Sequence, residues 1–164
     1  MPNLTVGKTA PAFQLATTTG ARLSLPEALA GGPVLLAFFK ISCPTCQFTF
    51  PFLQRMEMQL HKKGIRIWGV VQGNAQDGER FAAAYGVTFP ILIDDAPYKV
   101  SRAYGLSYVP TLFLVKADGT IEIFSEGFSK ADLLAIQKSL AESISATPPA
   151  LFLPTEQIPE YKPG

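Results

Sequence analysis

The sequence is poor in the side chains that bind metals through sulfur or imidazole. It holds two cysteines, Cys43 and Cys46, and one histidine, His61, among its 164 residues. A structural zinc site takes four such ligands, so this chain has too few for one. We therefore expect no bound metal.

The sequence also lacks an excess of either charge and a long apolar run. Its 14 Lys and Arg residues nearly balance its 13 Asp and Glu residues, which argues against nucleic acid or an anionic membrane as a partner. No apolar run approaches the roughly 20 residues of a membrane span. Residues 1–8 lack the charged stub and apolar segment of a signal peptide. We therefore expect a cytoplasmic protein without a membrane span, or a periplasmic one if a signal segment precedes this sequence.

The two cysteines form the motif Cys43-Pro44-Thr45-Cys46, which follows the apolar run 34–39 and opens a predicted helix. Residues three apart lie on one face of a helix, so the two thiols can form a disulfide with little backbone movement. Helix N-terminal amides stabilise a thiolate, which is the form that attacks a disulfide. The motif predicts a redox-active pair in which Cys43 is the nucleophile and Cys46 resolves the mixed disulfide.

Three neighbours are expected to tune the Cys43 thiolate. Lys40 adds a positive charge three residues before it, while Pro44 and Thr45 set which amides and dipoles face the sulfur. Pro44 also suits the first position of a helix, where its missing N–H costs nothing. The dithiol carries two electrons by itself, so we expect no cofactor.

Other interpretations of the cysteine pair stay open at this point. A structural disulfide that closes so short a loop would stabilise the fold little. Two soft thiolates suit Cu(I), so a copper carrier is possible. Redox chemistry remains the leading hypothesis because of the strand and helix that flank the pair.

The predicted elements alternate between strands and helices after a short N-terminal hairpin. This order predicts an α/β fold with a central mixed sheet and helices on both faces. Asp77 is the expected cap of one helix, and Ser129 with Asp132 opens the last one. The expected strands cover residues 34–39, 65–71, 90–93, 111–115 and 120–124, and the expected helices cover residues 44–62, 77–85, 98–104 and 129–144.

Two regions are expected: a domain over residues 1–145, with 1–33 as its N-terminal extension, and a proline-rich tail over 146–164. The tail holds five prolines and also several large apolar residues. A flexible linker would not carry that apolar load. We expect an extended strap packed over the domain or over a partner subunit, with a mobile tail as the alternative.

Several further motifs occur in order along the chain: residues 6–13, Phe38-Phe39 before the C-x-x-C motif, Phe50-Pro51, and residues 85–90, 103–106 and 109–114. Through these motifs, the chain over about residues 5–143 resembles thioredoxin-fold redoxins of the TlpA-like and AhpC/TSA-like kind. The resemblance implies a thiol-disulfide oxidoreductase with protein thiols and disulfides as substrates, recharged by thioredoxin or a reductase. In this family the proline before a late strand is cis and lies against the C-x-x-C motif, so Val109 and Pro110 would bind the substrate.

The chain departs from two related patterns. Peroxiredoxins place Thr or Ser three residues before the peroxidatic Cys and Pro four residues earlier, where this chain has Lys40 and Leu36. A thiol peroxidase is therefore the second hypothesis, and a non-catalytic Cu(I)-binding or interaction module is the third.

The second departure is from thioredoxins, which carry a buried Asp where this chain has Ala37. Glu57 and Asp77 are candidates for a proton-relay carboxylate, against the simpler interpretation as solvated surface charges.

Overall fold

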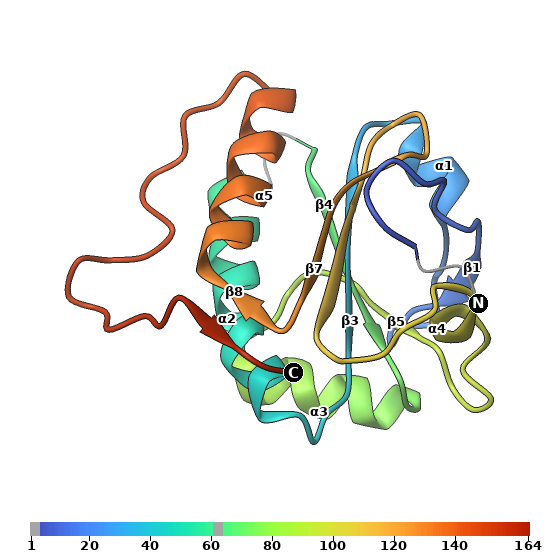
Figure 1. Ribbon diagram of the computed structural model, residues 1–164. Coiled ribbons are helices and arrows are strands. Elements are labelled where there is room, and N and C mark those ends of the chain that lie inside the picture. Colours follow the sequence, from blue (N-terminus) through green and yellow to red (C-terminus); the bar gives the residue numbers. More distant parts are fainter. Residues whose placement is uncertain (1–3, 61–63) are drawn as a thin grey trace.

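The computed structural model describes residues 4–60 and 64–164. At its centre lies a five-stranded sheet in the order β5-β4-β3-β6-β7 (Figure 1). Strand β3 (Val34–Phe39) occupies the middle of this sheet, parallel to β4 and antiparallel to β6. The mixed sheet predicted from the sequence is confirmed.

The other four strands match the predicted segments to within two residues. Strand β5 pairs with β4 in parallel, and β7 pairs with β6 in antiparallel fashion, so β5 and β7 form the two edges. The bounds are β4 (Arg66–Val71), β5 (Ile91–Ile93), β6 (Thr111–Val115) and β7 (Ile121–Glu126).

Helices cover both faces of the sheet, as predicted. One face carries α2 (Pro44–Leu60), α3 (Ala75–Tyr85) and α5 (Lys130–Ser143). The other face carries the two short helices α1 (Leu25–Leu29) and α4 (Lys99–Ala103). Helix α1 was not predicted, because its five residues are too few to show a helical period.

The expected N-terminal hairpin is confirmed as β1 (Gln14–Ala16) paired with β2 (Arg22–Ser24). The part of the predicted first helix beyond Leu60, with His61, lies outside the described residues. Among the residues that are described, no helix is long and apolar enough to cross a membrane.

Strand β3 is buried along its whole length because both of its faces pack against apolar layers. All six of its side chains have no exposed surface. Leu35 and Phe39 belong to the core under α2 and α5, whereas Leu36 and Phe38 belong to the core on the opposite face. A strand that is covered on both faces appears in the sequence as a continuous apolar run. This packing fixes the point at which the chain leaves the sheet toward the cysteine motif.

The prediction that Asp77 caps helix α3 is wrong. The cap is Asn74, whose side-chain oxygen accepts the Asp77 N–H at 2.8 Å. The Asp77 carboxylate in turn accepts the Asn74 N–H at 3.2 Å, which completes a capping box. At the start of α5 the predicted cap is confirmed, because Ser129 Oγ accepts the Asp132 N–H at 3.2 Å.

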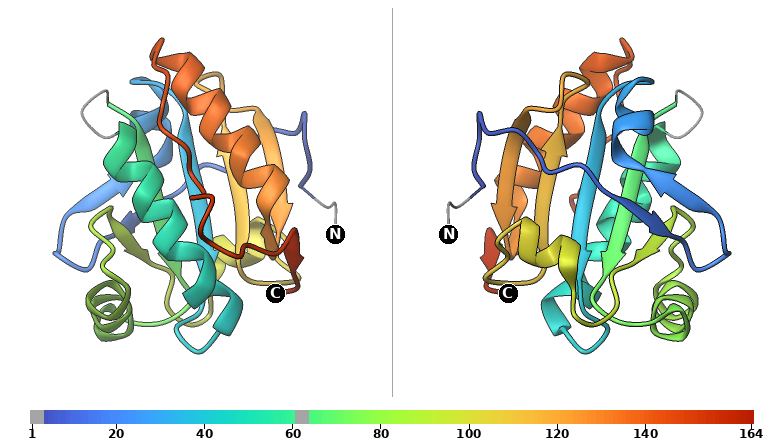
Figure 2. Two further views of the ribbon diagram at one scale, coloured as in Figure 1. Left: turned by 90° about the vertical axis from the view of Figure 1, so that its left-hand side faces the viewer. Right: turned by 90° about the vertical axis from the view of Figure 1, so that its right-hand side faces the viewer.

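Residues 146–164, the strap, run between α2 and α5 and pack against the core (Figure 2, left). Leu151 is only 1% exposed within the core. Arg55 of α2 donates to the Leu151 carbonyl at 2.7 Å and pairs with Glu156 at 2.8 Å. From α5, Gln137 Nε2 donates to the Pro149 carbonyl at 3.1 Å. The packed strap predicted from the sequence is confirmed, and it lies on the domain itself.

The strap ends in a strand that the sequence analysis missed. Strand β9 (Tyr161–Lys162) pairs in antiparallel fashion with β8 (Phe128–Ser129), which leads into α5. The Lys130 N–H also donates to the Glu160 carbonyl at 3.0 Å. Two-residue strands carry no alternating pattern, so their pairing cannot be recognised in the sequence.

Replacing Leu151 tests whether the strap shares the domain core. Leu151→Ala should lower the free energy of unfolding by about 2–4 kcal/mol, because it leaves a cavity at a fully buried position. Leu153→Ala is the matched control, since Leu153 is 47% exposed and should cost less than about 1 kcal/mol. Urea unfolding followed by circular dichroism measures both values. Equal and small losses would contradict the packed strap.

The ion pair between Arg55 and Glu156 should make strap anchoring depend on pH. The hydrogen bond from Arg55 lowers the pKa of Glu156 from 4.5 to about 2. A carboxyl with a lowered folded-state pKa adds stability above its unfolded pKa and loses it as the pH falls toward the folded value. Glu156→Gln should therefore lower the melting temperature at neutral pH and not at about pH 2. The decrease should be small, because the pair is partly exposed.

Thermal unfolding between neutral pH and about pH 2 measures this difference. Glu142→Gln on α5 is the control, because the Glu142 side chain is exposed. The expected result is a pH-dependent gap between wild type and Glu156→Gln that Glu142→Gln does not share. The same pH profile in both variants would contradict the anchoring role.

Candidate active site

The two cysteines lie where β3 ends and α2 begins. The Cys43 N–H donates to the Lys40 carbonyl at 3.2 Å, which closes the turn after the strand. The Gln47 N–H donates to the Cys43 carbonyl at 3.0 Å and starts the helical hydrogen bonding. Cys43 is half-buried and Cys46 has no exposed surface, and both are free thiols. The pair therefore has one accessible and one shielded sulfur, as the spacing predicts.

The Cys43 sulfur lies between a helix N-terminus and the segment that precedes β6. The Cys46 N–H donates to Cys43 Sγ at 3.1 Å. The Cys43 thiol is directed at the Val109 carbonyl, with 3.4 Å between Sγ and the oxygen. An amide at a helix N-terminus that points at a sulfur stabilises the thiolate. The arrangement suits a nucleophile that is already held in place.

Cys46 has the opposite environment. Burial raises the pKa of the Cys46 thiol above its ordinary value of 9.0, and the hydrogen bond with Cys43 raises that pKa further. The folded protein therefore keeps Cys46 as a neutral thiol at physiological pH. A buried neutral thiol next to an accessible one can act second, after the first sulfur has formed a bond.

The Val109–Pro110 peptide bond is cis, as the resemblance predicts. This segment is held on both sides. The Thr111 hydroxyl donates to the Tyr108 carbonyl at 2.6 Å, and the Gly127 N–H donates to the Pro110 carbonyl at 2.8 Å. The structure thus brings Val109 and Pro110 to Cys43 from the start of β6, the strand next to β3. Their role in substrate binding stays a prediction.

The three residues expected to tune the thiolate lie in different surroundings. Lys40 is exposed and lines a shallow cavity beside Val109. Pro44 is the first residue of α2, as predicted. Thr45 is buried, and its hydroxyl donates to the Pro163 carbonyl of the strap at 2.6 Å. The Thr45 side chain is therefore engaged with the strap, so an effect on the thiolate would have to come from its backbone.

Of the two candidates for a proton-relay carboxylate, Asp77 serves in the capping box of α3. Glu57 follows Cys46 by eleven helical residues, which is about 16 Å along the axis of α2, and it lines a cavity with Arg66 and Trp68. Across the described parts of the chain, no group of three or more His, Cys, Asp or Glu residues could hold a metal ion.

The site residues that sequence reasoning missed belong to the strap and to the turn before β8. Pro163 contacts Thr45, and the backbone of Gly164 lies directly against the Val109 carbonyl. Gly127 lies next to the backbone of Lys162. More than a hundred residues separate Thr45 from Pro163, so no local pattern links them. The apolar load of the tail was the only signal that it packs on the domain.

Comparison with known proteins gives three consistent findings. A model of the AhpC/TSA family matches residues 6–123. The chain is 33% identical over 130 residues to the thiol-disulfide oxidoreductase ResA of Geobacillus thermodenitrificans, a match that covers 78% of this chain and 74% of that protein. It is 27% identical to the crystal structure of a putative thiol:disulfide interchange protein DsbE from Chlorobium tepidum, with a TM-score of 0.76 and coverage of 87% and 99%.

A second solved structure bears on the fold. The thioredoxin domain of a thiol-disulfide oxidoreductase from Bacteroides vulgatus superimposes with a TM-score of 0.73 at 23% identity, over 84% of this chain and 99% of that one. The thioredoxin fold expected from the resemblance is therefore confirmed.

Alkylation should separate the two thiols. With the reduced protein at neutral pH, iodoacetamide should modify Cys43 and leave Cys46 unmodified, because Cys46 is buried and its raised pKa keeps it protonated. Peptide mapping by mass spectrometry locates the label. The same reaction in urea is the control and should label both cysteines. Equal labelling of both in the folded protein would contradict the division between an accessible and a shielded sulfur.

Proposed function

Because this chain belongs to the AhpC/TSA family, we propose that it is a thiol-disulfide oxidoreductase that exchanges disulfides with protein thiols through Cys43 and Cys46. The observation that supports this most directly is the 3.1 Å hydrogen bond from the Cys46 N–H to Cys43 Sγ. It orients a helix N-terminus toward a sulfur that solvent can reach. The buried partner lies three residues further on.

The first step is an attack of the Cys43 thiolate on one sulfur of a substrate disulfide. A bond forms between Cys43 Sγ and that sulfur, the substrate S–S bond breaks, and the second substrate sulfur leaves as a thiolate. The amide of Cys46 stabilises the attacking anion before the step. Val109 and Pro110 would hold the substrate chain beside Cys43.

The second step uses Cys46 to release the substrate. Cys46 gives up its proton and attacks Cys43 Sγ, so that the Cys43–Cys46 disulfide forms. The bond between Cys43 Sγ and the first substrate sulfur breaks, and that sulfur leaves and takes up the proton. Burial is the main cause of the raised pKa of Cys46, but hydrogen bonding and charge repulsion from Cys43 also contribute. The charge repulsion ends when Cys43 is held in the mixed disulfide, because a disulfide sulfur carries no charge. Cys46 then becomes easier to deprotonate at the moment when it must attack.

The reaction moves two electrons from the dithiol to the substrate, and the reverse reaction oxidises a substrate dithiol. The pair stores both electrons, so we propose no further cofactor. A reductant such as thioredoxin or a reductase would restore the dithiol.

The cytoplasmic location of the protein also stays a prediction, and cell fractionation tests it.

Insulin reduction in the presence of dithiothreitol tests this function. The wild type should accelerate the precipitation of insulin chains, and Cys43→Ser should fall to the rate of dithiothreitol alone, because the nucleophile is gone. Cys46→Ser should retain the first step and accumulate a mixed disulfide with the substrate, which non-reducing electrophoresis detects. An inactive wild type with a reducible pair would refute the proposal. Rapid and saturable consumption of peroxide would favour a thiol peroxidase instead.

A further inference from the structure

The last four residues described, 161–164, lie across the cysteine site and contact three separate parts of it. They pair with β8, they accept a hydrogen bond from Thr45, and they lie against Val109. We propose that this segment occupies the groove in which a substrate polypeptide binds, so that an extended substrate strand must replace it. This inference rests on the proposed function and names the substrate class that the site accepts.

The first contact is a strand pairing. Phe128 of β8 lies opposite Lys162, and Ser129 lies opposite Tyr161. A strand edge offers N–H and C=O groups to any extended chain, whatever its sequence. Residues 161–162 use that edge in this structure. A substrate segment could add to β8 in the same way once they leave.

The second contact lies inside the cysteine motif. Thr45 is 7% exposed and donates its hydroxyl to a backbone carbonyl, that of Pro163, at 2.6 Å. A backbone carbonyl is present in every polypeptide, so this hydrogen bond selects for a peptide chain and not for one sequence. When the segment leaves, water replaces the Pro163 carbonyl at the Thr45 hydroxyl. Thr45 therefore offers one hydrogen bond to any chain that enters the groove.

The third contact, between Gly164 and Val109, limits the size of the residue that can lie at this point. A Cβ atom built on Gly164 would collide with the carbonyl of Val109, so only a residue without a side chain fits there in this conformation. The same carbonyl is 3.4 Å from Cys43 Sγ. Bulk is therefore excluded close to the reacting sulfur. We infer a substrate strand with a small residue at this point.

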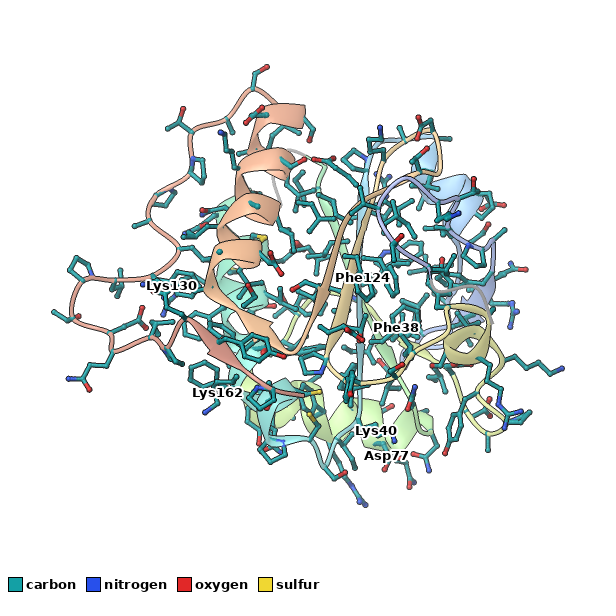
Figure 3. All side chains as sticks on the ribbon, viewed as in Figure 1. Phe38, Lys40, Asp77, Phe124, Lys130 and Lys162 are labelled. Atoms are coloured by element: carbon teal, nitrogen blue, oxygen red, sulfur yellow. The ribbon has the colours of Figure 1, made fainter. Side chains whose placement is uncertain are left out.

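Two further features fit a segment of peptide. Gly127 has a φ of +74°, and a Cβ there would come within 2.5 Å of the Lys162 carbonyl, so the glycine leaves room for the segment. The Lys162 ammonium lies 4.7 Å from the centre of the Phe48 ring. Figure 3 labels Lys162 beside the first turns of α2, with Lys40 at the same end of the molecule.

The strap is held unevenly, which allows its end to exchange. Leu151 and the Arg55–Glu156 pair anchor its middle, whereas Tyr161 in the short strand β9 is 55% exposed. The apparent affinity for a substrate protein would equal the intrinsic affinity multiplied by the fraction of molecules in which the groove is open. Cys43 stays half-exposed with the segment in place. A small disulfide that needs no groove can therefore reach it.

A variant that ends at Glu160 tests the proposal, because it keeps the strap anchors and removes only residues 161–164. The KM for insulin should fall by about tenfold, and the rate with the small disulfide 5,5′-dithiobis(2-nitrobenzoate) should stay within about twofold. A synthetic peptide of residues 155–164 should compete with insulin for the shortened variant. A peptide of the same composition in reversed order should compete less.

A point variant keeps the test valid if the shortened chain does not fold. Lys162→Ala removes the cation over Phe48, so it should lower the KM for insulin by about two- to fivefold. Lys138→Ala on α5 is the matched control, because Lys138 is exposed and away from the site. It should behave as the wild type does.

The outcomes separate this proposal from the proposed function. If both variants reduce the small disulfide normally and their KM for insulin is unchanged or higher, the segment does not compete with substrate and the proposal is overturned. If the wild type reduces neither disulfide, the proposed function fails, and the inference that rests on it fails too.

Discussion

The burial of β3 on both faces is the constraint on which the rest of the structure depends. Its side chains alternate between two apolar layers, and none of them reaches solvent. The chain leaves this core after Phe39 and reaches Cys43 four residues later, at the start of α2. The position of the reactive sulfur against the helical amides is therefore set by the packing of the sheet.

The sequence was sufficient to predict the features that depend on a local pattern of residues. The apolar run 34–39, Pro44 at the start of α2 and the shielded position of Cys46 all follow from periodicity and spacing. The error at α3 has a local cause, since Asn74 and Asp77 can both cap a helix. The capping box uses both residues, with Asn74 as the cap and Asp77 three residues later.

The rest of the site could not be predicted because it depends on contacts between distant segments. Thr45 was expected to act on the thiolate, but its hydroxyl bonds to Pro163, more than a hundred residues away. Strand β9 has two residues and no periodicity, so only the three-dimensional path of the strap shows where it pairs. Composition indicated that the strap packs, since Leu151 and its neighbours are apolar, but composition carries no information on where its end lies.

The middle and the end of the strap are held by different kinds of interaction, and these have different consequences for specificity. Side-chain burial at Leu151 holds its middle, and such burial depends on the shape of one residue. Backbone hydrogen bonds and strand pairing hold its end, and any extended chain can supply them. A groove that recognises mainly backbone atoms accepts many polypeptides. In the groove that we propose, selectivity would come from the close approach at Val109, which excludes bulk beside the sulfur. Recognition of this kind would fit substrates that share a disulfide and not a sequence.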